Sequence, residues 1–230
     1  MTAEQRRAWI ALVLLVPAPT IGALCAFIVA PGPIGQAIYT FCKLWILALP
    51  LIWHLGVERK RATFSPLAPE TRARALTEGL LLGLLFGAVV LAANALVGER
   101  WLDLQVLGAV LERAGLDTPA RYLGVALYIA LFNSLLEEYV WRWFAFRQLE
   151  RVAGARLAVP LAALCFTLHH VLVFAIQLGP QIAVLGSAAV FVAGCLWSGL
   201  YARWRSVWPA WISHVLVDVA GLWIGWRLLF

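Results

Sequence analysis

Apolar stretches long enough to cross a lipid bilayer recur along this whole chain, and they exclude most water-soluble folds. A transmembrane α-helix needs about 20 consecutive, mainly apolar residues. Seven stretches meet this requirement: 8–30, 34–57, 75–97, 121–146, 157–178, 181–201 and 208–228. The chain is 63% hydrophobic and only 13% charged, whereas about a quarter of the residues of a soluble domain are charged. We therefore predict an all-α fold, a polytopic membrane helical bundle of about seven spans.

The polar connections between these stretches leave one question of topology open. Residues 58–74 are strongly basic, and residues 98–121 have an amphipathic pattern that suits the membrane surface or a partial hairpin. Either connection could therefore hold an eighth helix, interfacial or re-entrant, and the sequence leaves this question open. The first apolar run continues to Ala30 without a clear cleavage site, so we interpret it as a retained span rather than a signal peptide. The whole chain, 1–230, is expected to form a single integral membrane domain.

The distribution of cationic residues predicts an orientation. With a cytoplasmic N-terminus, twelve Lys and Arg residues fall in cytoplasmic segments and four in external ones. Cytoplasmic segments of membrane proteins carry the excess of Lys and Arg, so the N-terminus is predicted inside and the C-terminus outside. Arg outnumbers Lys by 16 to 2, which favours a bacterial source and hence a bacterial inner (plasma) membrane. The net charge of +6 reflects this topology signal, and we expect no nucleic-acid partner.

A few ionisable side chains lie inside the apolar stretches, where such groups are costly and usually functional. They occur in the fourth, fifth and seventh stretches: Glu137, Glu138, Arg142, His169, His170, His214 and Asp218. Three further residues, Lys43, His54 and Glu78, are assigned to span ends, from which a side chain can reach the interface. Acid or imidazole groups in three separate spans are hard to explain structurally, and they predict an enzymatic site.

Helical spacing gives the two glutamates different partners. Glu138 and Arg142 are four residues apart, so they share a helix face and can form an ion pair. Glu137 lies about 100° away, on the stripe of Asn133 and Trp141. A carboxylate left without a counter-ion in a low-dielectric site is suited to take a proton from water. We therefore predict that Glu137 is the reactive member of the pair.

The histidines follow the same spacing argument. His214 and Asp218 are four residues apart, so Asp218 is expected to fix the tautomer of His214 and leave its other nitrogen free to act. Phe166 and His170 are also four apart, which places the aromatic ring at the wall of the site. His169 and His170 are adjacent and point about 100° apart, so at most one of them is expected to face the site.

Three short motifs in these spans resemble a known family. "EEYVWR" fits Glu-Glu-x-x-x-Arg, "FTLHH" fits Phe-x-x-x-His, and "HVLVD" fits His-x-x-x-Asn/Asp. Their order resembles that of the CAAX prenyl protease and bacteriocin-processing (CPBP, or ABI) family of glutamic-type intramembrane proteases. The resemblance covers residues 121–220 as a catalytic core, whereas residues 1–120 hold N-terminal spans without a signature.

The resemblance implies a role for each motif position. Glu137 would be the general base that activates water, Glu138 would support it, and Arg142 would hold both carboxylates. His170 would bind the water, and His214 would stabilise the oxyanion. Asp218 stands where family members often have Asn, so it is expected to orient His214. The substrate pocket is expected to include four residues, which are Asn133, Trp141, Phe166 and His169.

Metal dependence stays open from residue types alone. One Glu and two His residues would also satisfy a catalytic zinc ion. The resemblance favours a metal-free glutamate mechanism, and the chain lacks the His-Glu-x-x-His helix that supplies zinc ligands at fixed spacing. We therefore expect no cofactor, with zinc as the minor alternative.

The predicted function is an intramembrane endopeptidase that cuts near the membrane-associated C-terminal tail of its substrate. Its partners would be a membrane-anchored protein or peptide substrate and the lipid bilayer; the oligomeric state stays open. A proton-coupled membrane transporter is one alternative, because buried Glu, His and Arg also form proton relays. A non-catalytic membrane scaffold is the other.

Overall fold

The computed structural model describes residues 1–61, 65–101, 108, 112, 115–116 and 118–230, and the described part is helical without strands. Seven helical units within it are long and apolar enough to cross a membrane. The predicted all-α membrane bundle of seven spans is therefore confirmed. Its outer surface carries large exposed apolar side chains, among them Val13, Phe41, Leu81, Leu127 and Val184. Such a surface suits contact with lipid rather than with water.

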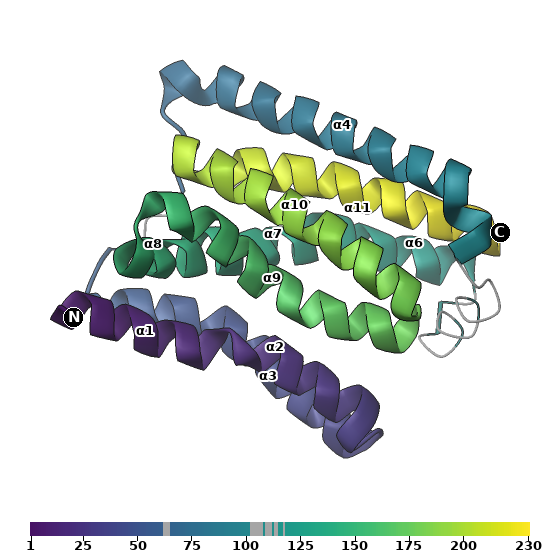
Figure 1. Cartoon of the computed structure of the whole chain (residues 1–230), viewed down its shortest axis with the longest axis horizontal. Helices are drawn as coiled ribbons and strands as arrows, with labels where there is room; N and C mark the ends of the chain where they lie inside the picture. The colour runs from purple at the N-terminus through teal and green to yellow at the C-terminus, as the bar shows by residue number, and fades with distance from the viewer. Residues whose placement is uncertain (62–64, 102–107, 109–111, 113–114, 117) are drawn as a thin grey trace.

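The first two spans form a hairpin. The first consists of α1 (Ala3–Leu15), α2 (Pro17–Leu24) and a π-helical turn at Cys25–Val29; the second consists of α3 (Pro33–Ile52) and a π-helical turn at Trp53–Val57. Pro17 begins α2, since proline lacks the N–H that would continue α1. Figure 1 shows α2 and α3 side by side, and α2 also contacts α9 (Ala155–Gln177).

The fourth span is the longest and alternates between α- and π-helical geometry. Its segments are α6 (Pro119–Leu127), Tyr128–Asn133, α7 (Ser134–Glu138), Tyr139–Phe146 and α8 (Arg147–Ala153), where the unlabelled segments are π-helical. The remaining spans are regular helices, namely α4 (Pro69–Trp101), α9 (Ala155–Gln177), α10 (Pro180–Trp204) and α11 (Trp208–Leu229).

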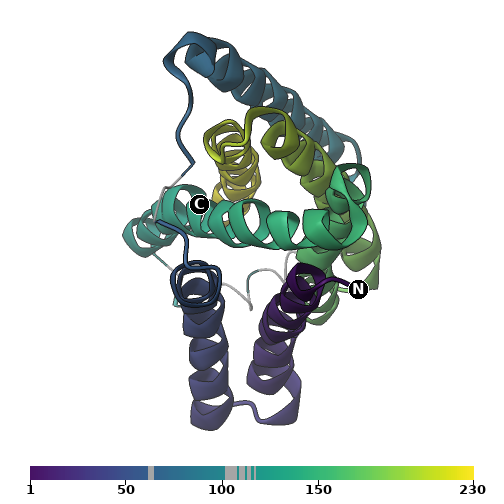
Figure 2. The same ribbon diagram turned by 90° about the vertical axis from the view of Figure 1, so that its left-hand side faces the viewer.

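The fourth span lies in the middle of the bundle (Figures 1 and 2). Helix α4 packs along α11, and α10 packs along α9. The fourth span contacts α1 and α3 on one side and α9, α10 and α11 on the other. Its π-helical segment Tyr139–Phe146 is the most buried part of the chain, with Val140, Trp141 and Phe146 almost without exposure. Residues on this segment therefore meet side chains from most other spans.

Two glycines let α4 approach α11 closely. A Cβ atom on Gly79 would lie 2.2 Å from the carbonyl oxygen of Pro209, and one on Gly83 would lie 2.8 Å from the Cα atom of Ser213. Small residues commonly permit such backbone contact between membrane helices. This contact fixes α11, which carries His214 and Asp218.

The helix ends agree with the predicted spans except where proline or packing moves them. Helix α4 begins at Pro69 rather than at 75, because proline suits the first turn of a helix. The fourth span extends from Pro119 to Ala153, beyond the predicted 121–146. No helix forms in the described residues between Glu58 and Pro69. Half of the predicted amphipathic segment 98–121 lies outside the described residues, and its first residues, 98–101, belong to α4.

Polar contacts join the basic segments at one end of the bundle, where the N-terminus lies (Figure 1). The Glu58 carboxylate accepts hydrogen bonds from Gln148 Nε2 at 2.8 Å and from Arg151, and it pairs with Lys60 at 3.3 Å. Burial alone would raise the pKa of Glu58, but the hydrogen bonds and charges of these partners lower the pKa to about 2. Glu58 thus ties the end of the second span to α8.

We predict that Glu58→Gln lowers the free energy of unfolding by about 1–3 kcal/mol at pH 7, because Arg151 loses its buried anionic acceptor. The depressed pKa means that Glu58 stabilises the fold above about pH 4.5 and loses this effect as the pH falls toward 2. Thermal unfolding in detergent at pH 7 and pH 3 measures both effects. Glu4→Gln is the control, since Glu4 also pairs with Arg151 but is 69% exposed. Equal melting of wild type and Glu58→Gln at pH 7 would contradict the prediction.

Candidate active site

The buried pair of Glu138 and Arg142 forms the base of the site. Their side chains are almost fully buried, and Glu138 Oε1 lies 3.1 Å from Arg142 Nη1. The predicted ion pair is therefore present. The guanidinium carbon of Arg142 also lies 4.6 Å from the ring centre of Phe166 and 5.2 Å from that of Trp197. Arg142 Nε and Nη2 have no hydrogen-bond acceptor among the described residues, so these cation–π contacts add to the ion pair with Glu138 in stabilising the buried charge.

His214 is held mainly by Glu138, not by Asp218. Its Nδ1 donates to Glu138 Oε1 at 2.9 Å, while its Nε2 lies 3.6 Å from Glu137 and 3.7 Å from Asp218. Its ring stacks on Trp197 at a centroid distance of 4.1 Å. The expectation that Asp218 fixes the tautomer and leaves the other nitrogen free is therefore wrong. Glu138 is able to take this place because α11 and α7 are in contact.

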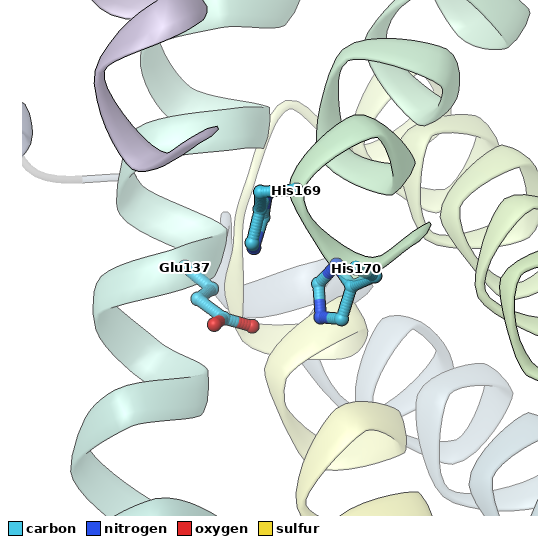
Figure 3. A group of neighbouring side chains, drawn as sticks. All are labelled: Glu137, His169 and His170. Carbon is cyan, nitrogen blue, oxygen red and sulfur yellow. The ribbon is translucent and has the colours of Figure 1, made fainter. Parts of the chain in front are cut away.

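Glu137 faces two imidazoles across the site. The ligand atoms of Glu137, His169 and His170 all lie within 4.8 Å of one another, and Figure 3 shows the carboxylate and both rings around one space. The expectation that at most one of the two histidines faces the site is wrong, since ring nitrogens of both lie within 4.8 Å of the Glu137 carboxylate. Asn133 Nδ2 donates to Glu137 Oε1 at 2.9 Å, which agrees with the predicted stripe.

Phe166 supports the site from behind. Its carbonyl oxygen accepts from His170 Nδ1 at 3.0 Å, which leaves Nε2 of that ring free for a ligand or a proton. Its ring centre lies 4.7 Å from that of His170 and 6.1 Å from that of His214. The Phe166 side chain is 1% exposed. It therefore orders the surrounding rings and has almost no surface of its own to offer a substrate.

A cavity of about 580 Å³ lies against Glu137, between the second span and the fourth. Three of the four predicted pocket residues line it, namely Asn133, Trp141 and His169, whereas Phe166 does not. The ring of His169 stacks on Trp141 at a centroid distance of 5.8 Å. Most of the remaining lining is apolar and comes from α3 and the fourth span. The volume falls within the usual range for a small-ligand pocket.

The donor set of this site also fits a metal ion. Glu137, His169 and His170 supply one oxygen and two nitrogen donors, which is the ligand number of a catalytic zinc site. His169 Nδ1 is buried and has no hydrogen-bond partner among the described residues. These three residues would be the ligands of such an ion.

Sequence reasoning missed two residues of the site. Trp197 on α10 contacts both Arg142 and His214, and no motif spacing points to it. Lys43 lines the cavity beside Glu137, although it was assigned to a span end. Its position near the middle of α3, ten residues after Pro33, could have indicated that Lys43 lies inside the bundle rather than at a span end.

We predict that breaking the buried pair from either side destabilises the protein by roughly 3–5 kcal/mol, because a buried charge loses its partner. Glu138→Gln and Arg142→Met test the two sides. The double variant removes both charges, so its loss should be smaller than the sum of the single losses. Thermal unfolding in one detergent measures all three variants. Glu150→Gln is the control, because its partner Arg205 is half exposed; strict additivity in the double variant would refute the coupling.

The comparison with protein-family models gives a match to the type II CAAX prenyl endopeptidase Rce1-like family over residues 119–220. No curated protein and no solved structure gives a significant match. The matched segment begins with α6 and ends within α11, so it contains all three motifs together with Glu137, His169 and His170. The description of this family names an endopeptidase, so the matched segment is similar to that of a protease. The matched segment is less than half of the chain, and over it this integral membrane protein resembles the type II CAAX prenyl endopeptidase Rce1-like family, in agreement with its three motifs.

Proposed function

We propose that this protein hydrolyses a peptide bond near the C-terminus of a membrane-anchored substrate, using a water molecule activated by Glu137. One observation carries the proposal: Glu137 lines a cavity with His169 and lies close to the imidazoles of both His169 and His170, whereas Glu138 is engaged by Arg142 and His214. Glu137 is therefore the acid of the pair that can meet water and substrate.

The residues around Glu137 would have different roles in the hydrolysis. His170 Nε2 would bind the attacking water beside Glu137, since Nδ1 is already occupied by the Phe166 carbonyl. His214 Nε2 would donate to the oxyanion of the tetrahedral intermediate when the ring is protonated. Donors of this kind lower the barrier by roughly 3–4 kcal/mol. Glu138 with Arg142 would keep the imidazole in place.

The proposed substrate is the C-terminal tail of a lipid-anchored or membrane-spanning protein. The cavity is mainly apolar and opens among the spans, so an apolar tail held at the bilayer fits it. We propose that the end of the bundle with the N-terminus faces the cytoplasm of a bacterial cell, because the basic segments gather there. The substrate would reach the cavity laterally or from that side.

The two other functions are less well supported. A proton-coupled transporter would need a route for protons across the bundle. The ionisable groups described above form a compact cluster next to one cavity instead. A non-catalytic scaffold would not require an acid and two imidazoles to converge.

We predict that Glu137→Gln and His170→Ala each reduce cleavage by at least about 100-fold, because a general base typically contributes 10²–10⁴-fold. Two quenched-fluorescent peptides in liposomes are the probes: one has a farnesylated Cys followed by three residues, and the other carries the same tail after a transmembrane helix. Glu70→Gln is the matched control, since Glu70 is exposed at the start of α4. Full activity in both variants would refute the assignment. Proton flux without cleavage would favour a transporter.

We also propose that hydrolysis is metal-free. Zinc bound by Glu137, His169 and His170 would act as a Lewis acid and activate water. However, Glu137 would then be a ligand, and Glu138 could not replace it as the base because Arg142 and His214 engage it.

We therefore expect activity to persist in strong chelators, and elemental analysis of the active protein to find zinc well below one ion per chain. Loss of activity in chelator, with recovery on adding Zn²⁺, would support the zinc mechanism instead. Parallel circular dichroism controls for unfolding by the chelator.

A further inference from the structure

Lys43 is a charged residue near mid-depth in the second span. It lies ten residues after Pro33 and nine before Ile52 in α3. About 15 Å of helix therefore separates it from the beginning of the span, further than a lysine side chain reaches. Extension to the membrane interface does not account for Lys43, and a cation at this depth is costly. We therefore expect a role for the Lys43 ammonium group inside the bundle.

No anionic side chain in the described part of the chain compensates Lys43. Its ammonium lies 5.7 Å from the ring centre of Tyr39, and no ion pair or hydrogen bond joins it to a described residue. Lys43 is partly exposed, to the cavity that it lines, and a charge withdrawn from bulk water is normally paired. The charge complement of Lys43 is therefore expected from a ligand in the cavity.

Lys43 and the proposed catalytic base line the same cavity from different spans. Lys43 lines it from α3, and Glu137 lines it from the fourth span. The wall between them is mainly apolar and includes Leu44, Leu47 and Val140. Among the lining residues, Lys43 is the one lysine or arginine. A ligand that fills this space thus meets a cation on one wall, an acid on another and apolar groups between them.

We propose that Lys43 binds the free C-terminal carboxylate of the substrate tail. This inference rests on the proposed endopeptidase function and adds a determinant of its specificity. An apolar tail necessarily brings one anionic group with it, which is its own terminal carboxylate, and that group matches the ammonium in charge. With the carboxylate at Lys43 and the scissile bond at Glu137, the cavity would fix the distance between the cut and the end of the chain.

The test compares two tails that differ only in the last group. The probes are the anchored peptides above, prepared with a C-terminal carboxylate or a C-terminal amide. For the wild type, the KM of the carboxylate peptide should be lower than that of the amide peptide by a factor on the order of 10 to 100, as expected for a charge-assisted hydrogen bond. Lys43→Met should remove this preference through KM, with kcat for the carboxylate changed much less. Lys43→Arg should retain most of it.

Lys60→Met is the matched control, because Lys60 is the other lysine of the chain and pairs with Glu58 outside the spans. It should keep the wild-type preference. Binding of the two peptides to Glu137→Gln, measured by fluorescence anisotropy, separates recognition from catalysis. If wild type cleaves both tails equally, or if Lys43→Met keeps the preference, the role of Lys43 is refuted while the protease stands. If wild type cleaves no anchored tail, the proposed function itself fails.

Discussion

The buried ion pair between Glu138 and Arg142 is the interaction on which the rest of the site depends. Two opposite charges in a low-dielectric interior must stay together, because either one alone would be strongly destabilising. The pair also organises its neighbours: Arg142 lies against Phe166 of α9 and Trp197 of α10, and Glu138 accepts from His214 of α11. One salt bridge on the central span thus connects three other spans.

This arrangement explains why two adjacent acids have different chemistry. Glu138 pairs with Arg142 and accepts from His214, and its side chain is buried. Its carboxylate is therefore held in place and has no access to solvent. Glu137, one residue earlier and about 100° round the helix, turns to the cavity and the histidines. The π-helical geometry that follows at Tyr139–Phe146 is typical of functional sites, where it re-aims side chains within a helix. The site therefore combines a rigid base with one accessible acid.

The remaining charges of the bundle separate into two kinds. Those near the N-terminal end, such as Glu58 and Arg151, join helix ends where water and lipid headgroups reduce the cost of charge. Those at mid-depth belong to the cavity or its base. Lys43 is the cation of the second kind that has no anionic partner among the described residues, whereas Arg142 is paired with Glu138.

The sequence by itself determined the bundle and the local pairings. Apolar runs of bilayer length define the spans, and the spacing of four residues defines the Glu138–Arg142 pair, because both depend only on positions within one helix. The sequence did not determine which side chains of different helices are in contact. That Glu138 rather than Asp218 holds His214 Nδ1, that both His169 and His170 reach Glu137, and that Lys43 shares their cavity were decided by tertiary packing. The periodicity of one helix gives the direction in which a side chain points. The distance and rotation of the neighbouring helix decide what that side chain meets.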